Sequence, residues 1–174
     1  MNYATIKDTD IANGEGIRIS LFVSGCTHHC KNCFNKETWD FDYGNEFTQQ
    51  VQDQIIDMLK PNYINGLTLL GGEPMEPQNQ KGLLPFIKKV KQIFGDTKSI
   101  WCYTGYIFDK DLKPDGMAYT QITDELLNNF DVMVDGPFVE RLKDISLKFR
   151  GSSNQRIIDV KQSLKTGKTV IYLQ

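Results

Sequence analysis

The chain has 174 residues, of which 40% are hydrophobic, and a formal net charge of −2. This is enough apolar material for one core, so a single domain spanning residues 1–174 is expected. The weak acidic balance argues against direct nucleic-acid binding, and no apolar run approaches the roughly 20 residues of a membrane span. Without an apolar signal core near the N-terminus, a cytoplasmic location is expected, where clustered cysteines indicate a metal or catalytic site rather than disulfides.

The amino-terminal part of the chain is expected to be irregular as far as a turn at Asn13-Gly14-Glu15-Gly16, where two glycines permit positive φ. A strand is predicted next, over 17–23, because apolar residues alternate along it. Three of the four cysteines follow this strand on one short loop, as Cys26, Cys30 and Cys33, which are spaced four and then three residues apart.

The rest of the chain alternates helical and strand patterns. Helices are predicted over 48–60, 82–94 and 123–129, and strands over 67–70, 99–103, 131–134 and 168–173. Thr48 and Thr123 are the expected N-caps of the first and third helices. Pro85 is expected in the first turn of the second helix, where a missing N–H costs nothing, and Gly95 is expected to close that helix. Residues 157–164 fit either a strand fragment or a helical turn.

Strands that alternate with helices indicate βαβ units and a parallel sheet. In such sheets, ligands collect at the carboxyl ends of the strands. Four unusual sequences lie at these ends: the cysteine loop, Gly71-Gly72-Glu73-Pro74, Thr104-Gly105-Tyr106 and Asp135-Gly136-Pro137-Phe138. Four loops on one rim predict a shared site.

Three thiolates on one tight loop suit an iron–sulfur cluster in which one iron has no protein ligand. The alternative is a zinc site completed by His28 or His29, although structural zinc usually takes four ligands in two separated pairs. The fourth cysteine, Cys102, lies in an apolar strand and is expected to be a buried core residue.

The Gly71–Pro74 sequence by itself indicates only a turn from strand to loop. Beside a cysteine loop, its two glycines would let backbone carbonyls approach a ligand's ammonium group, with Glu73 adding negative charge. Residues 141–156 are rich in Lys and Arg, which fits a solvated face or a docking surface for an acidic partner.

These motifs resemble the radical S-adenosylmethionine superfamily. The spacing of Cys26, Cys30 and Cys33 is similar to its cluster motif, and Gly71–Pro74 is similar to its motif for the methionine amino group. Within the superfamily, the chain resembles the activating proteins of anaerobic ribonucleoside-triphosphate reductase as far as about residue 160. The supporting segments are 13–16, 30–35, 38–40, 104–106, 135–138, 150–152 and 154–156. Asn32 departs from the superfamily, where an aromatic residue often precedes the third cysteine.

The resemblance implies a [4Fe–4S] cluster on the catalytic and metal-binding residues Cys26, Cys30 and Cys33, with S-adenosylmethionine at the open iron. Reduction by a flavodoxin-like electron donor would cleave S-adenosylmethionine, and the resulting 5′-deoxyadenosyl radical would create a glycyl radical on the large subunit of the reductase. The cofactor-binding residues implied are Asn32, Cys33, Phe34, Gly71, Gly72, Glu73, Thr104 and Asp135.

The fold implied is an α/β, incomplete and open (β/α) barrel with a mostly parallel sheet, wide enough at its mouth to admit a peptide. Two other functions stay open: a zinc-binding structural or interaction module, and an activase of a different glycyl-radical enzyme. The oligomeric state also stays open, a homodimer included.

Overall fold

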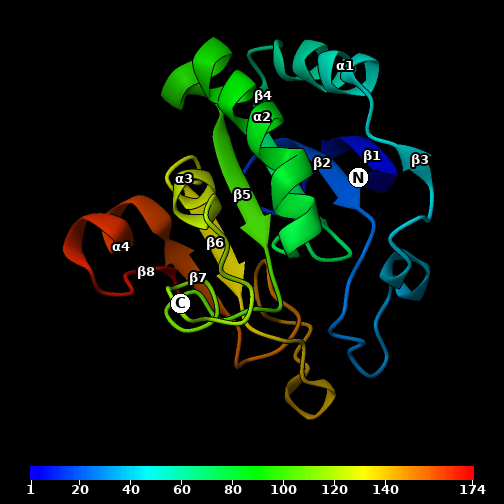
Figure 1. The fold of residues 1–174 in the computed structure, drawn as a ribbon. Coiled ribbons are helices and arrows are strands. Elements are labelled where there is room, and N and C mark those ends of the chain that lie inside the picture. The colour runs from blue at the N-terminus through cyan, green and yellow to red at the C-terminus, as the bar shows by residue number, and fades with distance from the viewer.

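The computed structural model describes residues 1–174 and contains one eight-stranded sheet in the order β3-β1-β2-β4-β5-β6-β7-β8 (Figure 1). The strands are β1 (Asn2–Asp10), β2 (Ile17–Val23), β3 (Asn45–Glu46), β4 (Ile64–Gly71), β5 (Ser99–Tyr103), β6 (Val132–Asp135), β7 (Arg156–Asp159) and β8 (Ile171–Leu173). The helices are α1 (Gln49–Leu59), α2 (Pro77–Phe94), α3 (Thr123–Leu127) and α4 (Val160–Thr166), with short 3-10 turns at Lys36–Trp39, Gly95–Thr97 and Glu140–Leu142.

The sheet is mixed, so the expectation of a mostly parallel sheet is wrong. Only the central strands β2, β4, β5 and β6 pair in parallel. The outer strands β1, β3, β7 and β8 pair antiparallel with their neighbours. The reason lies in the connections, since a parallel pair needs a crossover. A short turn joins β1 to β2, and the segment 136–155 contains no crossover helix and returns directly from β6 into β7.

The amino-terminal segment is also regular, where an irregular lead-in was expected. Residues 2–10 form β1, which pairs with β2 from Tyr3 opposite Val23 to Asp10 opposite Arg18. Most of its side chains are exposed or half-buried, as suits a strand near the edge of the sheet. Because the residues of β1 are mostly polar, the sequence pattern does not predict this strand.

The helices follow the predicted positions with three corrections. Thr48 caps α1 as predicted, because its hydroxyl accepts a hydrogen bond from the Val51 N–H at 3.4 Å. Helix α2 begins at Pro77 rather than at residue 82, so Pro85 lies in its interior and not in its first turn. Thr123 is the first residue of α3 and not its N-cap, since its hydroxyl is bonded to Gln80 Oε1 at 2.7 Å.

Two further expectations are settled by the structure. Gly95 ends α2 as predicted. The segment 157–164 contains both of the proposed structures, because β7 runs directly into α4. Asp159 separates them, and its carboxylate accepts a hydrogen bond from the Gln162 N–H at 2.9 Å, which caps the helix.

The two faces of the sheet are covered differently. On one face, α1, α2 and α3 pack against alternate strand residues to form the main core of 28 buried residues, and Figure 1 shows α2 crossing this face. The opposite face carries a small apolar cluster of Trp101, Val132, Val134 and Ile157. Only strand residues and the segment 136–155 pack against this cluster, so no helix covers this second face.

Arg18 forms the floor of this second face, beside Trp101. Its side chain is fully buried and donates to Thr68 Oγ1 at 2.7 Å, Leu67 O at 2.8 Å and Ser99 O at 2.9 Å. Its guanidinium also lies 5.4 Å from the Trp101 ring centroid. Burial lowers the pKa of Arg18 to about 10, which leaves it charged at neutral pH. The residue therefore ties β2, β4 and β5 together at their amino ends.

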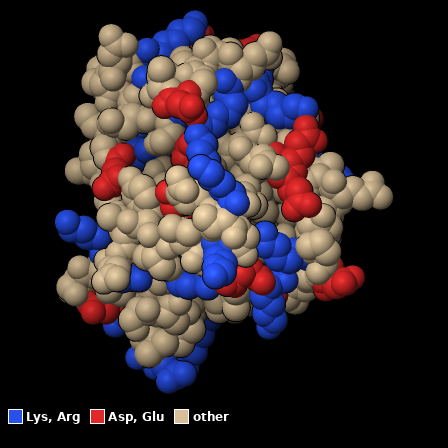
Figure 2. Space-filling view, turned by 90° about the vertical axis from the view of Figure 1, so that its left-hand side faces the viewer, with Lys and Arg blue, Asp and Glu red and all other residues tan.

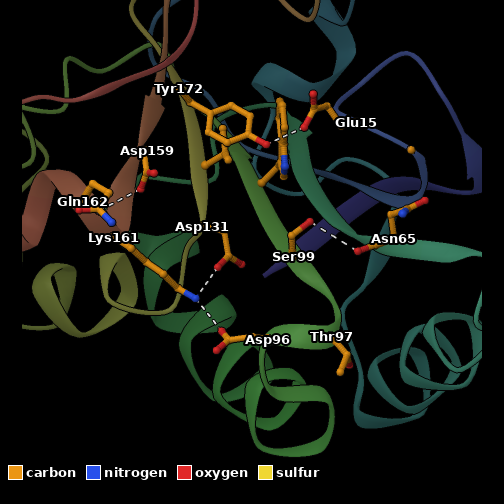
Figure 3. Close-up of a pocket in the computed structure, with 13 residues that line it drawn as sticks. Glu15, Asn65, Asp96, Thr97, Ser99, Asp131, Asp159, Lys161, Gln162 and Tyr172 are labelled. Atoms are coloured by element: carbon orange, nitrogen blue, oxygen red, sulfur yellow. Dashed lines mark hydrogen bonds and ion pairs between the residues drawn. The ribbon is translucent and has the colours of Figure 1, made fainter.

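A cavity of about 420 Å³ lies below this floor, where the central strands begin (Figure 3). Its charged side chains are paired within the chain. Lys161 Nζ lies 2.7 Å from Asp131 Oδ1 and 2.6 Å from Asp96 Oδ1, and the Tyr172 hydroxyl donates to Glu15 Oε2 at 2.6 Å. These pairs fasten α4 and β8 to the base of the sheet.

The outer surface carries both charge signs. Figure 2 shows Lys and Arg side chains interspersed with Asp and Glu over most of one face, in keeping with 20 basic and 22 acidic residues. No helix in the chain is both long and apolar enough to span a membrane.

Replacing Arg18 tests its role in the floor. We expect Arg18→Met to lower the free energy of unfolding by at least about 2 kcal/mol, because it removes several charge-assisted hydrogen bonds and leaves buried acceptors unpaired. Urea denaturation measures this loss. Arg141→Met is the control, since Arg141 is exposed and should change stability by less than about 0.5 kcal/mol. Equal losses in both variants would contradict the assignment.

Candidate functional site

A cavity of about 270 Å³ lies at the carboxyl ends of the four central strands. All four strand-end loops contribute to its lining, as the parallel centre of the sheet predicts. Of the predicted site residues, those that line it are Cys26, Cys30, Cys33, Phe34, Gly71, Gly72, Glu73 and Thr104. Asn32 and Asp135 are not in the lining. His28, which was named only as a possible zinc ligand, lines the cavity as well, together with Phe138, Arg150 and Gln155.

The cysteine loop reverses tightly after β2. Cys26 is buried at its base, Cys30 and Cys33 are half-buried, and the Cys33 N–H donates to Cys30 O at 3.1 Å. His29 and Asn32 adopt left-handed conformations, with φ of 48° and 60°. Asn tolerates this conformation better than most residues, because its short polar side chain can bond locally. Asn32 therefore has a backbone role in the reversal, and its predicted contact with a cofactor stays a prediction.

Main-chain hydrogen bonds join the cysteine loop to the Gly71–Pro74 loop. The Gly72 N–H donates to Val23 O and the Glu73 N–H donates to Gly25 O, both at 2.8 Å. The Gly25 N–H in turn donates to Thr38 O at 2.8 Å. A Cβ on Gly72 would lie 2.6 Å from Gly25 O and 2.8 Å from Thr38 O, closer than real contacts allow. The close packing of these two loops therefore requires glycine at position 72, whether or not a ligand is bound.

Glu73 is a buried carboxylate at the back of the cavity, with a side chain 1% exposed. Its Oε2 accepts a hydrogen bond from the Gly105 N–H at 2.7 Å and lies 2.9 Å from His28 Nε2, while Oε1 accepts from the Met75 N–H at 2.8 Å. An ionised carboxylate can accept about four hydrogen bonds. Glu73 thus keeps capacity for one further donor, and its orientation is fixed in advance.

His28 links the cysteine loop to two other loops. Its ring contacts Glu73 and packs against Tyr106, with ring centroids 4.3 Å apart. Burial of the ring opposes its protonation, but the hydrogen bond and negative charge of Glu73 outweigh this and raise the pKa of His28. Gly105 faces the same ring, and a Cβ there would lie 2.7 Å from it.

Burial affects the protonation state of two of the three thiols, Cys26 and Cys30. It raises the pKa of Cys26 to about 12 and also raises the pKa of Cys30, with the negative charge of Glu73 adding to both effects. In the free chain these groups are therefore protonated at neutral pH. Since a metal binds the thiolate, loading the site must release protons.

Two polar residues at the start of α2 complete the bracing of the cysteine loop. Glu76 Oε1 accepts hydrogen bonds from the Thr27 N–H at 2.8 Å and the Thr27 hydroxyl at 2.6 Å. The Asn79 amide donates to Ser24 O and to Glu73 O, both at 2.9 Å. Sequence reasoning missed both residues. The available signal was a carboxylate and an amide placed just after the Gly71–Pro74 loop.

Thr104 and Asp135 have different surroundings. Thr104 is buried in the cavity wall, where its hydroxyl accepts from the Tyr106 N–H at 3.1 Å. Asp135 accepts instead from Arg156 Nε at 2.9 Å and from the Phe108 N–H at 2.8 Å. Arg156 also pairs with the exposed Asp109 at 3.0 Å. Asp135 thus anchors β7 beside the cavity, and its predicted cofactor contact stays a prediction.

The residues present fit an iron–sulfur cluster. Three thiols from one loop face one cavity, next to a buried carboxylate and close-packed glycines. No group of three or more His, Cys, Asp or Glu side chains is arranged in the chain to hold a metal ion. A cube needs no such convergence, because each of the three thiolates binds a different iron.

A protein-family model described as a 4Fe-4S single cluster domain matches residues 12–158. The match includes all four strand-end loops, the cysteine loop among them.

Curated relatives match about nine-tenths of the chain. The chain is 45% identical over 159 residues to the anaerobic ribonucleoside-triphosphate reductase-activating protein of Pasteurella multocida, covering 90% of this chain and 96% of the relative. It is 44% identical to the protein of that name from Escherichia coli K12, covering 89% and 96%. The protein of that name from Enterobacteria phage T4 is 40% identical, covering 90% and 93%.

Gly72→Ala tests the joint between the two loops. We expect it to lower the free energy of unfolding by about 1–3 kcal/mol, because the new methyl group must displace backbone atoms. The measurement is the urea midpoint of the purified chain. Gly167→Asn is the matched control, since Gly167 has φ 69° and ψ 12° and nothing within 4 Å of its Cβ position. A Gly72→Ala protein as stable as the control would exclude the proposed crowding.

Asp109 provides a test by pH. The hydrogen bonds from Arg156 lower its pKa to about 2 from an ordinary value of 3.8. A carboxyl with a lowered folded-state pKa contributes stability that is complete above its unfolded value and is lost as the pH falls toward about 2. We expect the urea midpoint to fall less steeply below about pH 4 in Asp109→Asn than in the wild type. Asp42→Asn, at an exposed carboxylate outside any ion pair, should follow the wild type.

Proposed function

This chain belongs to the family of anaerobic ribonucleoside-triphosphate reductase-activating proteins and contains its 4Fe-4S domain, and we propose that it activates the reductase by reductive cleavage of S-adenosylmethionine. In this proposal the product is a glycyl radical on the large subunit of the reductase. The observation that carries it is the single cavity in which three thiols, two glycines and a buried glutamate meet.

Cys26, Cys30 and Cys33 would hold a [4Fe–4S] cluster by three of its irons. The bound cluster would supply one electron to the sulfonium of S-adenosylmethionine, which yields methionine and the 5′-deoxyadenosyl radical that takes a hydrogen atom from glycine. The chain itself positions the ligand and excludes water. Cys26 lies deepest, at 9% exposure, so the cysteine loop turns its first ligand away from solvent.

The ammonium group of S-adenosylmethionine would be bound at the Gly71–Pro74 loop. Glu73 has one acceptor position beyond its three partners and is held by the Gly105 and Met75 N–H groups. Gly71 and Gly72 line the same wall, where their carbonyl oxygens would add acceptors. Thr104 offers a hydroxyl to the carboxylate or the ribose. We assign Asn32, Phe34 and Asp135 to the cofactor only as proposals from family resemblance.

The shape of the sheet fits a protein substrate. We propose that the eight strands form an incomplete barrel of the radical S-adenosylmethionine type, open along the side that no helix covers. A glycine within another protein's backbone can reach the cavity only through a wide mouth. A flavodoxin-like protein is the proposed electron donor, since a single low-potential electron is needed for each cleavage.

The direct test uses anaerobically reconstituted protein. We expect brown protein that forms 5′-deoxyadenosine when dithionite and S-adenosylmethionine are added, because the cluster supplies the electron. Cys26→Ala, Cys30→Ala and Cys33→Ala should each abolish this product. Cys102→Ala is the matched control, since Cys102 is fully buried in β5 outside the cavity and should keep the activity.

Three outcomes would contradict the proposal in different ways. Stoichiometric zinc without iron after reconstitution would favour the structural zinc module. Full iron without 5′-deoxyadenosine would exclude the cleavage reaction. Cleavage that produces a glycyl radical only on some other enzyme, and not on the reductase, would change the target and keep the chemistry.

A further inference from the structure

The segment 137–155 packs against the face of the sheet that no helix covers and also lines the cavity. It is held there by a short hairpin, in which Lys143 and Ser152 form an antiparallel bridge and the Asp144 N–H donates to Gly151 O at 3.2 Å. Phe149 packs the hairpin against the sheet, because its ring lies edge-on to the Trp101 ring with the two centroids 5.4 Å apart. The hairpin is therefore packed in place on one side.

The other side of the hairpin is turned to solvent and carries apolar groups. Ile145 is 94% exposed, and Phe34 on the cysteine loop is 82% exposed, which makes them the two most exposed large hydrophobic side chains of the chain. The two loops are in contact, because Lys143 Nζ lies 5.5 Å from the Phe34 ring centroid. Phe34 and Gly151 both line the cavity, so the cysteine loop and the hairpin that carries Ile145 both reach its mouth.

The two loops that meet at the mouth carry an excess of positive charge, and Arg150 lines the cavity itself. Residues 26–39 and 139–155 together carry six Lys or Arg against three Asp or Glu, although the whole chain carries 20 against 22. Figure 2 shows Lys and Arg side chains at the lower tip of the molecule, the end where Figure 1 draws the gold turn near residue 140. Single exposed hydrophobic residues need no explanation, but two exposed apolar side chains on neighbouring basic loops beside a cavity are typical of a binding surface.

We infer that a docking face made of Phe34, Ile145, Lys31, Lys36, Lys143 and Lys148 binds an acidic segment of the reductase large subunit that carries an apolar side chain near its reactive glycine. This inference rests on the proposed function. The occupant is the large subunit rather than the electron donor, because the polypeptide that inserts a glycine into the cavity must itself cover the mouth. An electron needs no such insertion.

The experiment measures binding separately from chemistry. Reconstituted protein is titrated with purified large subunit by calorimetry, and 5′-deoxyadenosine formed with dithionite is measured without the large subunit. We expect Ile145→Asp and Lys148→Glu each to raise the Kd by about tenfold or more, as for central interface residues. Both should leave the uncoupled cleavage unchanged. Wild-type binding should also weaken as ionic strength rises.

The matched controls are Met117→Asp and Lys110→Glu. Met117 is 77% exposed and Lys110 is exposed, and neither lines the cavity. Equal Kd values for Ile145→Asp and Met117→Asp would overturn the inference. So would unchanged binding to the large subunit with slower reduction by a protein electron donor, which would assign the face to the donor. If the wild type failed to form 5′-deoxyadenosine without the large subunit, the proposed function would be contradicted. The Kd values would still test the docking face, because binding is measured separately.

Discussion

The site depends on one set of main-chain hydrogen bonds, which link the end of β2 to the end of β4. Through Gly72 to Val23 and Glu73 to Gly25, the loop that carries the thiols and the loop that carries the buried glutamate become one body. Glu73 then extends this body to a third loop through the Gly105 N–H. The bonds run between neighbouring parallel strands, so the register of the sheet sets the geometry of the site.

Much of the site could be predicted from the sequence, because its parts are local. Cys26, Cys30 and Cys33 are close in the chain, and Gly71–Pro74 follows an apolar run that ends abruptly. Parallel strands place their carboxyl ends together, so strand-end motifs converge even when strand limits are wrong by several residues. For this reason the early start of α2 and the misplaced cap of α3 left the predicted rim intact.

What could not be predicted depends on partners far apart in the chain. The polar segment 2–10 forms a strand because it pairs with β2. Its own sequence lacks the alternation of apolar and polar residues that would predict a strand. Asp135 precedes a glycine at a strand end, as a ligand-binding residue would, yet it pairs with Arg156 some 21 residues later. Glu76 and Asn79 brace a loop about 50 residues earlier in the chain. The reversal from β6 into β7 likewise follows from where the segment 136–155 packs.

An open sheet has two edges, and each is a template on which another chain could add a strand. Here the edges are β3, with two residues, and β8, with three. Strands this short offer too few free backbone groups for stable pairing, although Ile171 and Tyr172 on β8 are partly exposed. The open sheet is thereby protected from edge-to-edge aggregation with copies of itself.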